Sequence, residues 1–261
     1  MIDLDRNRKI NAALSALYEE YCADYLTTYI QAFGDGNPPE RINEFGIIDE
    51  ERYDADNGIL FVAKETNDWD NKDFQNGYFF RKWMNSITKQ GLSGHAKEHP
   101  LMWYNIGRWA SLLDNPSQSI PALAEAKGEA IEKIGTIAFT NINKVRGKNQ
   151  AKSEYASLAY SDISGMLLRE ELSIIQPKMI VCCGTYYEFA HHVRDFNGQV
   201  IAMPHSGVRI PVKRRARSGG TVRSFQCKRR SRSIPNGVKR RPSVLSVQRP
   251  QFLTELRPLV S

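Results

Sequence analysis

The chain alternates short apolar segments with longer segments of helical periodicity. Four apolar segments are candidates for strands: Ile59–Ala63, Ile137–Thr140, Met179–Cys183 and Val200–Met203. Segments with apolar residues at every third or fourth position lie between them, such as "LMWYNIGRWASLL" and "SGMLLREELSII". Strands that are apolar on both faces and alternate with helices indicate a mainly parallel sheet that is covered on both sides.

We therefore predict an α/β fold with a three-layer α/β/α architecture and a central, mainly parallel, four-stranded sheet. An amphipathic N-terminal helix precedes it, because apolar residues recur at steps of three and four. These residues are Ile10, Leu14, Leu17, Tyr21 and Tyr25. The stretch "GDGNPPERINEFG" then interrupts the helix with Gly and Pro.

The charge of the chain changes sign at about residue 209. Residues 1–208 hold 21 Lys and Arg against 28 Asp and Glu, a net charge of −7. Residues 209–261 hold 15 Lys and Arg and a single acid, Glu255, a net charge of +14. This tail has no sustained period, so we predict that it is disordered, because it buries too little apolar surface to offset its ordering entropy.

Two explanations of the tail stay open: a segment that binds nucleic acid, or a terminus produced by a shifted reading frame. Either way, the predicted division has three parts. Residues 1–45 form an N-terminal helix and connector, residues 46–208 form the α/β/α domain, and residues 209–261 form the basic tail.

Composition argues against several classes of protein. No apolar run approaches the roughly 20 residues that span a bilayer, and the N-terminus lacks the apolar segment of a signal peptide, so no membrane partner is predicted. The four cysteines form no Cys-x-x-Cys pair, and Cys182 and Cys183 are predicted to be small core residues in a reducing cytoplasm. The histidine pair in "HAKEH" lacks a third ligand. We predict no metal and no cofactor, and the sequence leaves the oligomeric state open.

Polar residues follow each of the four predicted strands. In chain order these stretches are Lys64–Asn67, Asn141–Arg146, Gly184–Tyr186 and Pro204–Gly207. Parallel strands end at the same edge of a sheet, and open α/β sheets bind their ligands outside that edge. The sequence therefore predicts a binding or catalytic site there.

These strand ends resemble motifs of the uracil-DNA glycosylase superfamily. Its members carry Gly-Gln-Asp-Pro, Gly-Ile-Asn-Pro or Gly-Glu-Ala-Pro after the first strand, Thr-Asn and a basic stretch after the second, a Pro-Lys-apolar-Gly strand, and a late His-Pro-Ser. The counterparts here are "VAKETN", "FTNINKVRGKN", "QPKMIVCCG" and "MPHSG", in the same order within residues 55–207. Ala63 replaces the glycine, Thr66 replaces the proline, and Pro204 precedes His205. The cysteines do not reproduce the spacing of the iron–sulfur branch, so no cluster is inferred.

The resemblance implies a DNA N-glycosylase that hydrolyses the bond between uracil or another altered base and its sugar. This reaction passes through an oxocarbenium-like sugar and a departing base anion. By the resemblance, Glu65 positions the water and His205 donates to the base oxygen. In the branch with Gly-Glu, the acid aligns with Lys64 instead.

The resemblance also implies how DNA is held. Asn141, or Asn143 in its place, reads the amide face of the base, and Phe79 or Phe80 stacks on the extruded base. A loop with three basic residues contacts the DNA phosphates. These residues are Lys144, Arg146 and Lys148.

Each of these residues also has a structural interpretation. Glu65 can open a helix, Asn141 can end a strand in a turn, the two phenylalanines can belong to the core, and His205 can be structural. Two other functional classes therefore stay open. One is a non-catalytic relative that binds a nucleotide, nucleic acid or a partner protein, and the other is an unrelated doubly wound protein.

Overall fold

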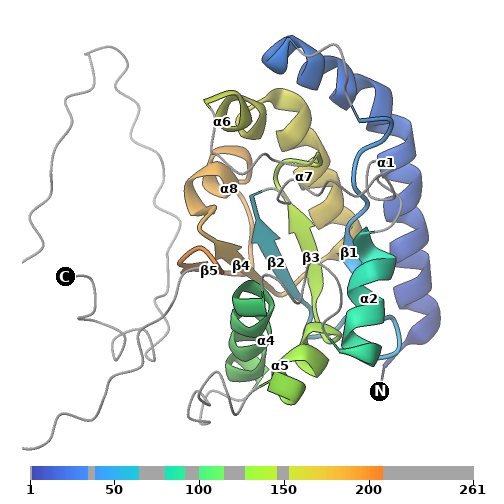
Figure 1. Cartoon of the computed structure of the whole chain (residues 1–261). Helices are drawn as coiled ribbons and strands as arrows, with labels where there is room; N and C mark the ends of the chain where they lie inside the picture. Colours follow the sequence, from blue (N-terminus) through green and yellow to red (C-terminus); the bar gives the residue numbers. More distant parts are fainter. Residues whose placement is uncertain are drawn as a thin grey trace, which may run out of the picture.

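A mixed five-stranded sheet lies at the centre of the molecule (Figure 1). The computed structural model describes residues 2–34, 39–64, 80–91, 100–114, 127–145 and 153–207. Its strands are β1 (Gly46–Ile47), β2 (Ile59–Ala63), β3 (Ala138–Asn141), β4 (Met179–Cys183) and β5 (Gln199–Met203). Its helices are α1 (Leu4–Phe33), α2 (Phe80–Gln90), α4 (Pro100–Asp114), α5 (Lys127–Ile134), α6 (Ser153–Ala159), α7 (Asp162–Ile175) and α8 (Tyr186–His192).

The prediction of an α/β fold is confirmed, but the prediction of four strands is wrong. The strand order is β1-β3-β2-β4-β5, and β1 pairs antiparallel with β3. The other neighbouring pairs are parallel. The two-residue strand β1 was missed because it is too short to show an alternating pattern. Within the described residues, no helix combines the length and apolar character needed to cross a bilayer.

The sheet has a topological switch point between β2 and β4. The chain leaves β2 through α2, α4 and α5, which lie on one side of the sheet, and leaves β3 through α6 and α7, which lie on the other side (Figure 1). From β4 the chain enters α8, which packs against α7. Ligands of open α/β sheets bind at such a point, outside the carboxyl ends of the strands.

Helix α1 is part of the same core as the sheet. It packs against α6 and α7, and its predicted apolar stripe faces inward, with Leu14 and Tyr25 fully buried. The Asp3 side chain caps the first turn by accepting a hydrogen bond from the backbone N–H of Arg6 at 3.0 Å. Gly34 ends the helix in the left-handed region, with φ of 59°.

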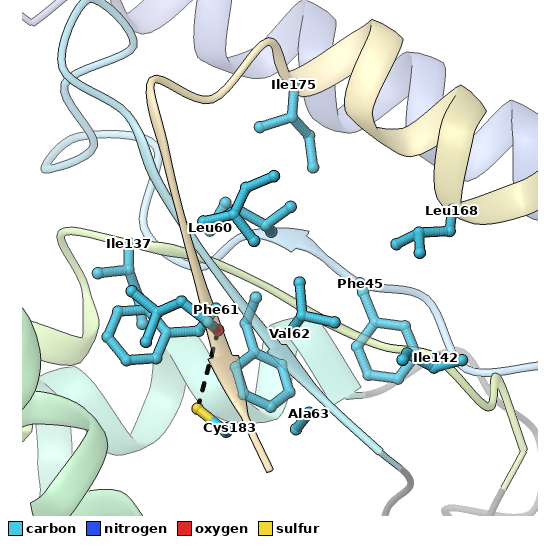
Figure 2. Close-up of a cluster of buried hydrophobic side chains, with 14 of the residues drawn as sticks. Phe45, Leu60, Phe61, Val62, Ala63, Ile137, Ile142, Leu168, Ile175 and Cys183 are labelled. Carbon is cyan, nitrogen blue, oxygen red and sulfur yellow. Dashed lines mark hydrogen bonds between the residues drawn. The ribbon is translucent and has the colours of Figure 1, made fainter. Parts of the chain in front are cut away.

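Strand β2 buries both of its faces, as its apolar sequence predicts. Leu60 and Val62 lie on the side of α7, and Phe61 and Ala63 lie on the opposite side (Figure 2). The cysteines at the end of β4 are also buried and free, which confirms their predicted role as core residues. Burial raises the pKa of both thiols, to about 12 for Cys182, so neither is a thiolate nucleophile at neutral pH.

Gly107 lets α4 approach α5 closely. A Cβ atom at this position would lie 1.8 Å from the carbonyl oxygen of Ala130, which belongs to the helical backbone of α5. We therefore expect Gly107→Ala to force the helices apart and to lower the free energy of unfolding by at least about 1–3 kcal/mol. Urea denaturation followed by circular dichroism measures this change.

Gly128→Ala is the matched control, because nothing lies within 4 Å of a Cβ atom at Gly128 in α5. Alanine has the higher helix propensity, so this variant should gain up to about 1 kcal/mol. A Gly107→Ala variant as stable as the wild type would contradict the close packing of α4 on α5.

Candidate functional site at the carboxyl edge of the sheet

The strand ends at the switch point are joined by hydrogen bonds beyond the sheet itself. The backbone N–H of Asn143 donates to the carbonyl oxygen of Lys64 at 2.8 Å, which ties the segment after β3 to the end of β2. The buried hydroxyl of Thr185 donates to the carbonyl oxygen of Val62 at 2.7 Å, which ties the segment after β4 to β2. The residues after three neighbouring strands therefore form one fixed edge.

His205 follows β5 and lies against the end of β4. Gly184 has φ of 76°, and a Cβ atom there would lie 3.2–3.3 Å from the backbone and Cβ of His205, so only glycine suits this close approach. The turn after His205 is anchored from α4, because Asn105 Nδ2 donates to the carbonyl oxygen of Ser206 at 2.7 Å. The backbone of His205 is thus fixed, while part of its side chain remains accessible to solvent.

The His205 ring presents a defined tautomer. The backbone N–H of Gly207 donates to Nδ1 at 3.1 Å, so the neutral ring carries its proton on Nε2. Partial burial, followed by the positive charge of Lys64, lowers the pKa of His205 below its usual 6.5. At neutral pH the side chain is therefore an uncharged donor through Nε2.

Asn141 is the last residue of β3, and its side chain is almost fully buried, with 1% exposed. Thr140 bonds to Glu171 of α7, and Phe139 contacts Phe80 of α2, so the alternation of the strand places Asn141 on the side of α2. Its register partner on β2 is Ala63. Among the described residues, no donor reaches Asn141 Oδ1. A buried carbonyl oxygen without a donor is costly, and the N–H group of a ligand would remove that cost.

The structure corrects the predicted role of Lys144. This residue was expected to contact phosphate from a solvated loop, but its side chain is 0% exposed. Its ammonium lies 2.5 Å from Glu171 Oε1, and it also donates to Thr140 Oγ1 at 2.8 Å and to the carbonyl oxygen of Asn141 at 2.5 Å. All three N–H groups of the ammonium are used inside the protein, so none is left for phosphate.

Glu171 is the centre of this buried network. Its carboxylate accepts from the Tyr18 hydroxyl at 2.5 Å and from the Thr140 hydroxyl at 2.9 Å, in addition to pairing with Lys144. The network therefore joins α1, the end of β3 and α7. Burial, together with the Glu171 charge, raises the pKa of Tyr18, and burial lowers the pKa of Lys144. Sequence reasoning missed Glu171, although an acid between Leu168 and Leu172 on the inward face of α7 is a signal for a buried partner.

The structure also corrects the stacking role considered for Phe80. Its ring is 4% exposed and packs between Phe45 and Phe139, with ring centroids 4.9 and 5.6 Å away. Trp83 and Trp103 complete this aromatic cluster. The position of Phe80 on the inward face of α2 makes it a core residue, which leaves no ring face for a base.

Asn143, the alternative base reader, is fully buried and donates to the carbonyl oxygen of Tyr155 in α6 at 3.0 Å. It therefore connects the segment after β3 to α6. Four of the predicted site residues lie outside the described part of the chain. These are Glu65, Phe79, Arg146 and Lys148.

The edge thus brings together the segments that hold Lys64, Asn141 and His205. No role was predicted from the sequence for Lys64. Its position directly after the first long strand was the sequence feature that could have indicated a place at this edge. Among the described residues, no group of three or more His, Cys, Asp or Glu side chains is placed to hold a metal ion. In comparisons with known proteins, no family model, curated protein or solved structure matches the chain.

The buried network predicts a large effect of single substitutions. Lys144→Met leaves the Glu171 carboxylate buried without its counter-ion, so we expect the free energy of unfolding to fall by about 3–5 kcal/mol. Lys144→Met combined with Glu171→Gln should lose less than the sum of the two single changes, since it removes both charges. Chemical denaturation of the three variants measures the coupling.

Lys133→Met is the control for removal of a lysine. Lys133 pairs with Asp114 at 2.5 Å in a pair whose side chains are 28% and 64% exposed, so its loss should cost at most about 1 kcal/mol. Equal losses in Lys144→Met and Lys133→Met would argue against a buried ion pair.

Proposed function

We propose that the protein is a uracil-DNA glycosylase-like hydrolase that removes uracil or another altered base from DNA. One observation carries the proposal: the buried Asn141 side chain, whose carbonyl oxygen accepts from no donor among the described residues, ends the strand beside β2, at the same edge as a neutral His205. A carboxamide recognises the amide groups of a base, and a neutral imidazole donates to a base oxygen. The three-layer α/β/α architecture belongs to the same proposal, and Figure 1 supports it.

In the proposed reaction, the base leaves its sugar while bound at this edge. Asn141 Oδ1 accepts from an N–H group of the base, and His205 Nε2–H donates to a base oxygen on which negative charge develops. Glu65, the residue after Lys64, positions the attacking water in this proposal. DNA is the partner, and the base must be extruded from the helix to reach a buried asparagine.

A second candidate is a protein of the same fold that binds a nucleotide, nucleic acid or a partner protein without catalysis. Two observations favour it. Phe80 has no free ring face and Lys144 has no free ammonium, so two groups that a DNA glycosylase would use serve the core instead. Residues 1–208 also carry a net charge of −7, which opposes DNA binding outside the local site.

Release of a base tests the proposed activity. An oligonucleotide with a single uracil should acquire alkali-labile abasic sites when incubated with the protein. Because His205 stabilises the departing base, His205→Ala should lower the single-turnover rate about 10²-fold, and Asn141→Ala should lower it by a similar factor. His191→Ala is the matched control, since His191 is an exposed histidine on α8. Equal rates for wild type and both site variants would remove these residues from the mechanism.

DNA binding tests the non-catalytic candidate separately. If the protein releases no base from a panel of altered oligonucleotides, the nucleic-acid-binding form of the second candidate predicts salt-sensitive binding of unmodified DNA, because phosphate contacts release counterions. Fluorescence anisotropy at low and moderate salt measures this. An affinity that is independent of salt would argue against phosphate contacts.

A further inference from the structure

We propose that Tyr160, Tyr186 and Tyr187 form an aromatic patch that stacks on unpaired bases of single-stranded DNA. The patch lies on the surface, where α8 leaves the carboxyl edge of the sheet. The inference takes DNA as the partner from the proposed function, but it does not require that any base is released. It adds a binding surface and a preference for unpaired bases to that function.

The patch begins at the edge of the sheet. The hydroxyl of Thr185, the residue before α8, donates to the carbonyl oxygen of Val62 at 2.7 Å, so the start of α8 is held at the end of β2. Tyr186 and Tyr187 are the first two residues of the helix, and their ring centroids lie 5.8 Å apart. A DNA strand that places one base at the edge would bring its neighbouring bases to this helix.

The tyrosine side chains of the patch are accessible to solvent. Among the described large hydrophobic residues, Tyr187 is the most exposed, at 79%, and Tyr160 is 40% exposed. Tyr160 lies between α6 and α7 and meets α8 at His191, with ring centroids 5.1 Å apart; Figure 1 shows α6 and α8 next to each other. His191 is one helical turn from Tyr187, so the two exposed tyrosines belong to one surface.

The ring of Tyr187 has a face that is free for stacking. Its plane makes an angle of 72° with that of Tyr186, an edge-to-face contact in which one ring offers its edge and the other a single face. In either arrangement Tyr187 keeps at least one face, and within the described part of the chain no other ring contacts it. A tyrosine face stacks on any base, because every base has a π-face.

The charges around the patch favour contacts to bases over contacts to phosphates. Arg169 and Arg194 lie at the far end of α8, and Asp162, Glu188 and Asp195 lie around the same helix. Three acids against two bases do not attract a polyanion, so stacking must carry the affinity. A double helix stacks its bases on one another and offers the patch no base face, whereas a single strand does.

The first experiment compares the affinities of the full-length protein for a short oligothymidylate and for an oligonucleotide of the same length built of stable abasic residues. Both carry the same phosphates, so the basic residues 209–261 act on both alike, and the ratio of the affinities reports contacts to bases. The wild type should prefer the oligothymidylate. Tyr187→Ala should lower the ratio about tenfold, the usual scale for the loss of one stacked base.

Two variants are the controls for this measurement. Tyr187→Phe keeps the ring and should keep the ratio, because stacking does not need the hydroxyl. Ile2→Ala removes a side chain that is 41% exposed, before α1, and should keep the ratio as well. A wild type that binds both oligonucleotides equally overturns the proposal, and so does an equal ratio in Tyr187→Ala and the wild type.

The second experiment locates the contact. Ring signals of ¹³C-labelled tyrosines are recorded by NMR in the full chain, and those of Tyr187 are identified by their loss in Tyr187→Phe. Oligothymidylate should shift the Tyr187 signals upfield, because a stacked base places the ring in its ring current, and the abasic oligonucleotide should not. Signals that ignore both oligonucleotides overturn the proposal. Signals that instead follow protein concentration without DNA would assign the patch to a second copy of the chain, which also overturns it.

Failure of this inference can be told apart from failure of the proposed function. If the preference for oligothymidylate depends on Tyr187 but no base is released from uracil-containing DNA, the patch stands and the proposed catalysis is wrong. If bases are released and the affinity ratio does not depend on Tyr187, the proposed function stands and the patch does not bind DNA.

Discussion

The buried ion pair between Lys144 and Glu171 is the constraint on which the candidate site depends. Both side chains are fully buried, so the charges must find all their partners inside the protein. The Tyr18 and Thr140 hydroxyls donate to Glu171, and Lys144 donates to the carbonyl oxygen of Asn141, so these groups form one network. The hydrogen bonds of the Lys144 ammonium therefore fix the turn after β3 and, with it, the backbone that carries Asn141.

The same constraint explains why α1 belongs to the domain core. Tyr18 meets Glu171, and the Tyr25 hydroxyl accepts from the backbone N–H of Lys144 at 2.8 Å. The segment before β1 contributes as well, since Phe45 lies beneath the ammonium, 5.3 Å from ring centroid to Nζ. A helix that precedes the sheet by many residues thus holds one of the loops at its carboxyl edge.

Most of the fold could be predicted from the sequence, because its strands are apolar on both faces and its helices have a clear period. The four long strands and the inward stripe of α1 follow from that pattern alone. Strand β1 could not be predicted, since two residues carry no period. The residues of the site were harder to predict than the strands. A lysine in a polar loop has the same local sequence whether it faces solvent or a buried acid, and only the tertiary position of Glu171 separates the two cases for Lys144.

The electrostatics of the site are consequently local rather than a property of the whole domain. Residues 1–208 are acidic overall, and Lys144, which the sequence suggested as a surface cation, adds nothing to the surface potential because it is paired in the core. Among the described residues at the switch point, Lys64 is the charged side chain that acts on the uncharged His205. A net charge of −7 opposes the approach of polyanions to residues 1–208 in general, so any anion that binds there must be held by local groups and not by the net charge of the domain.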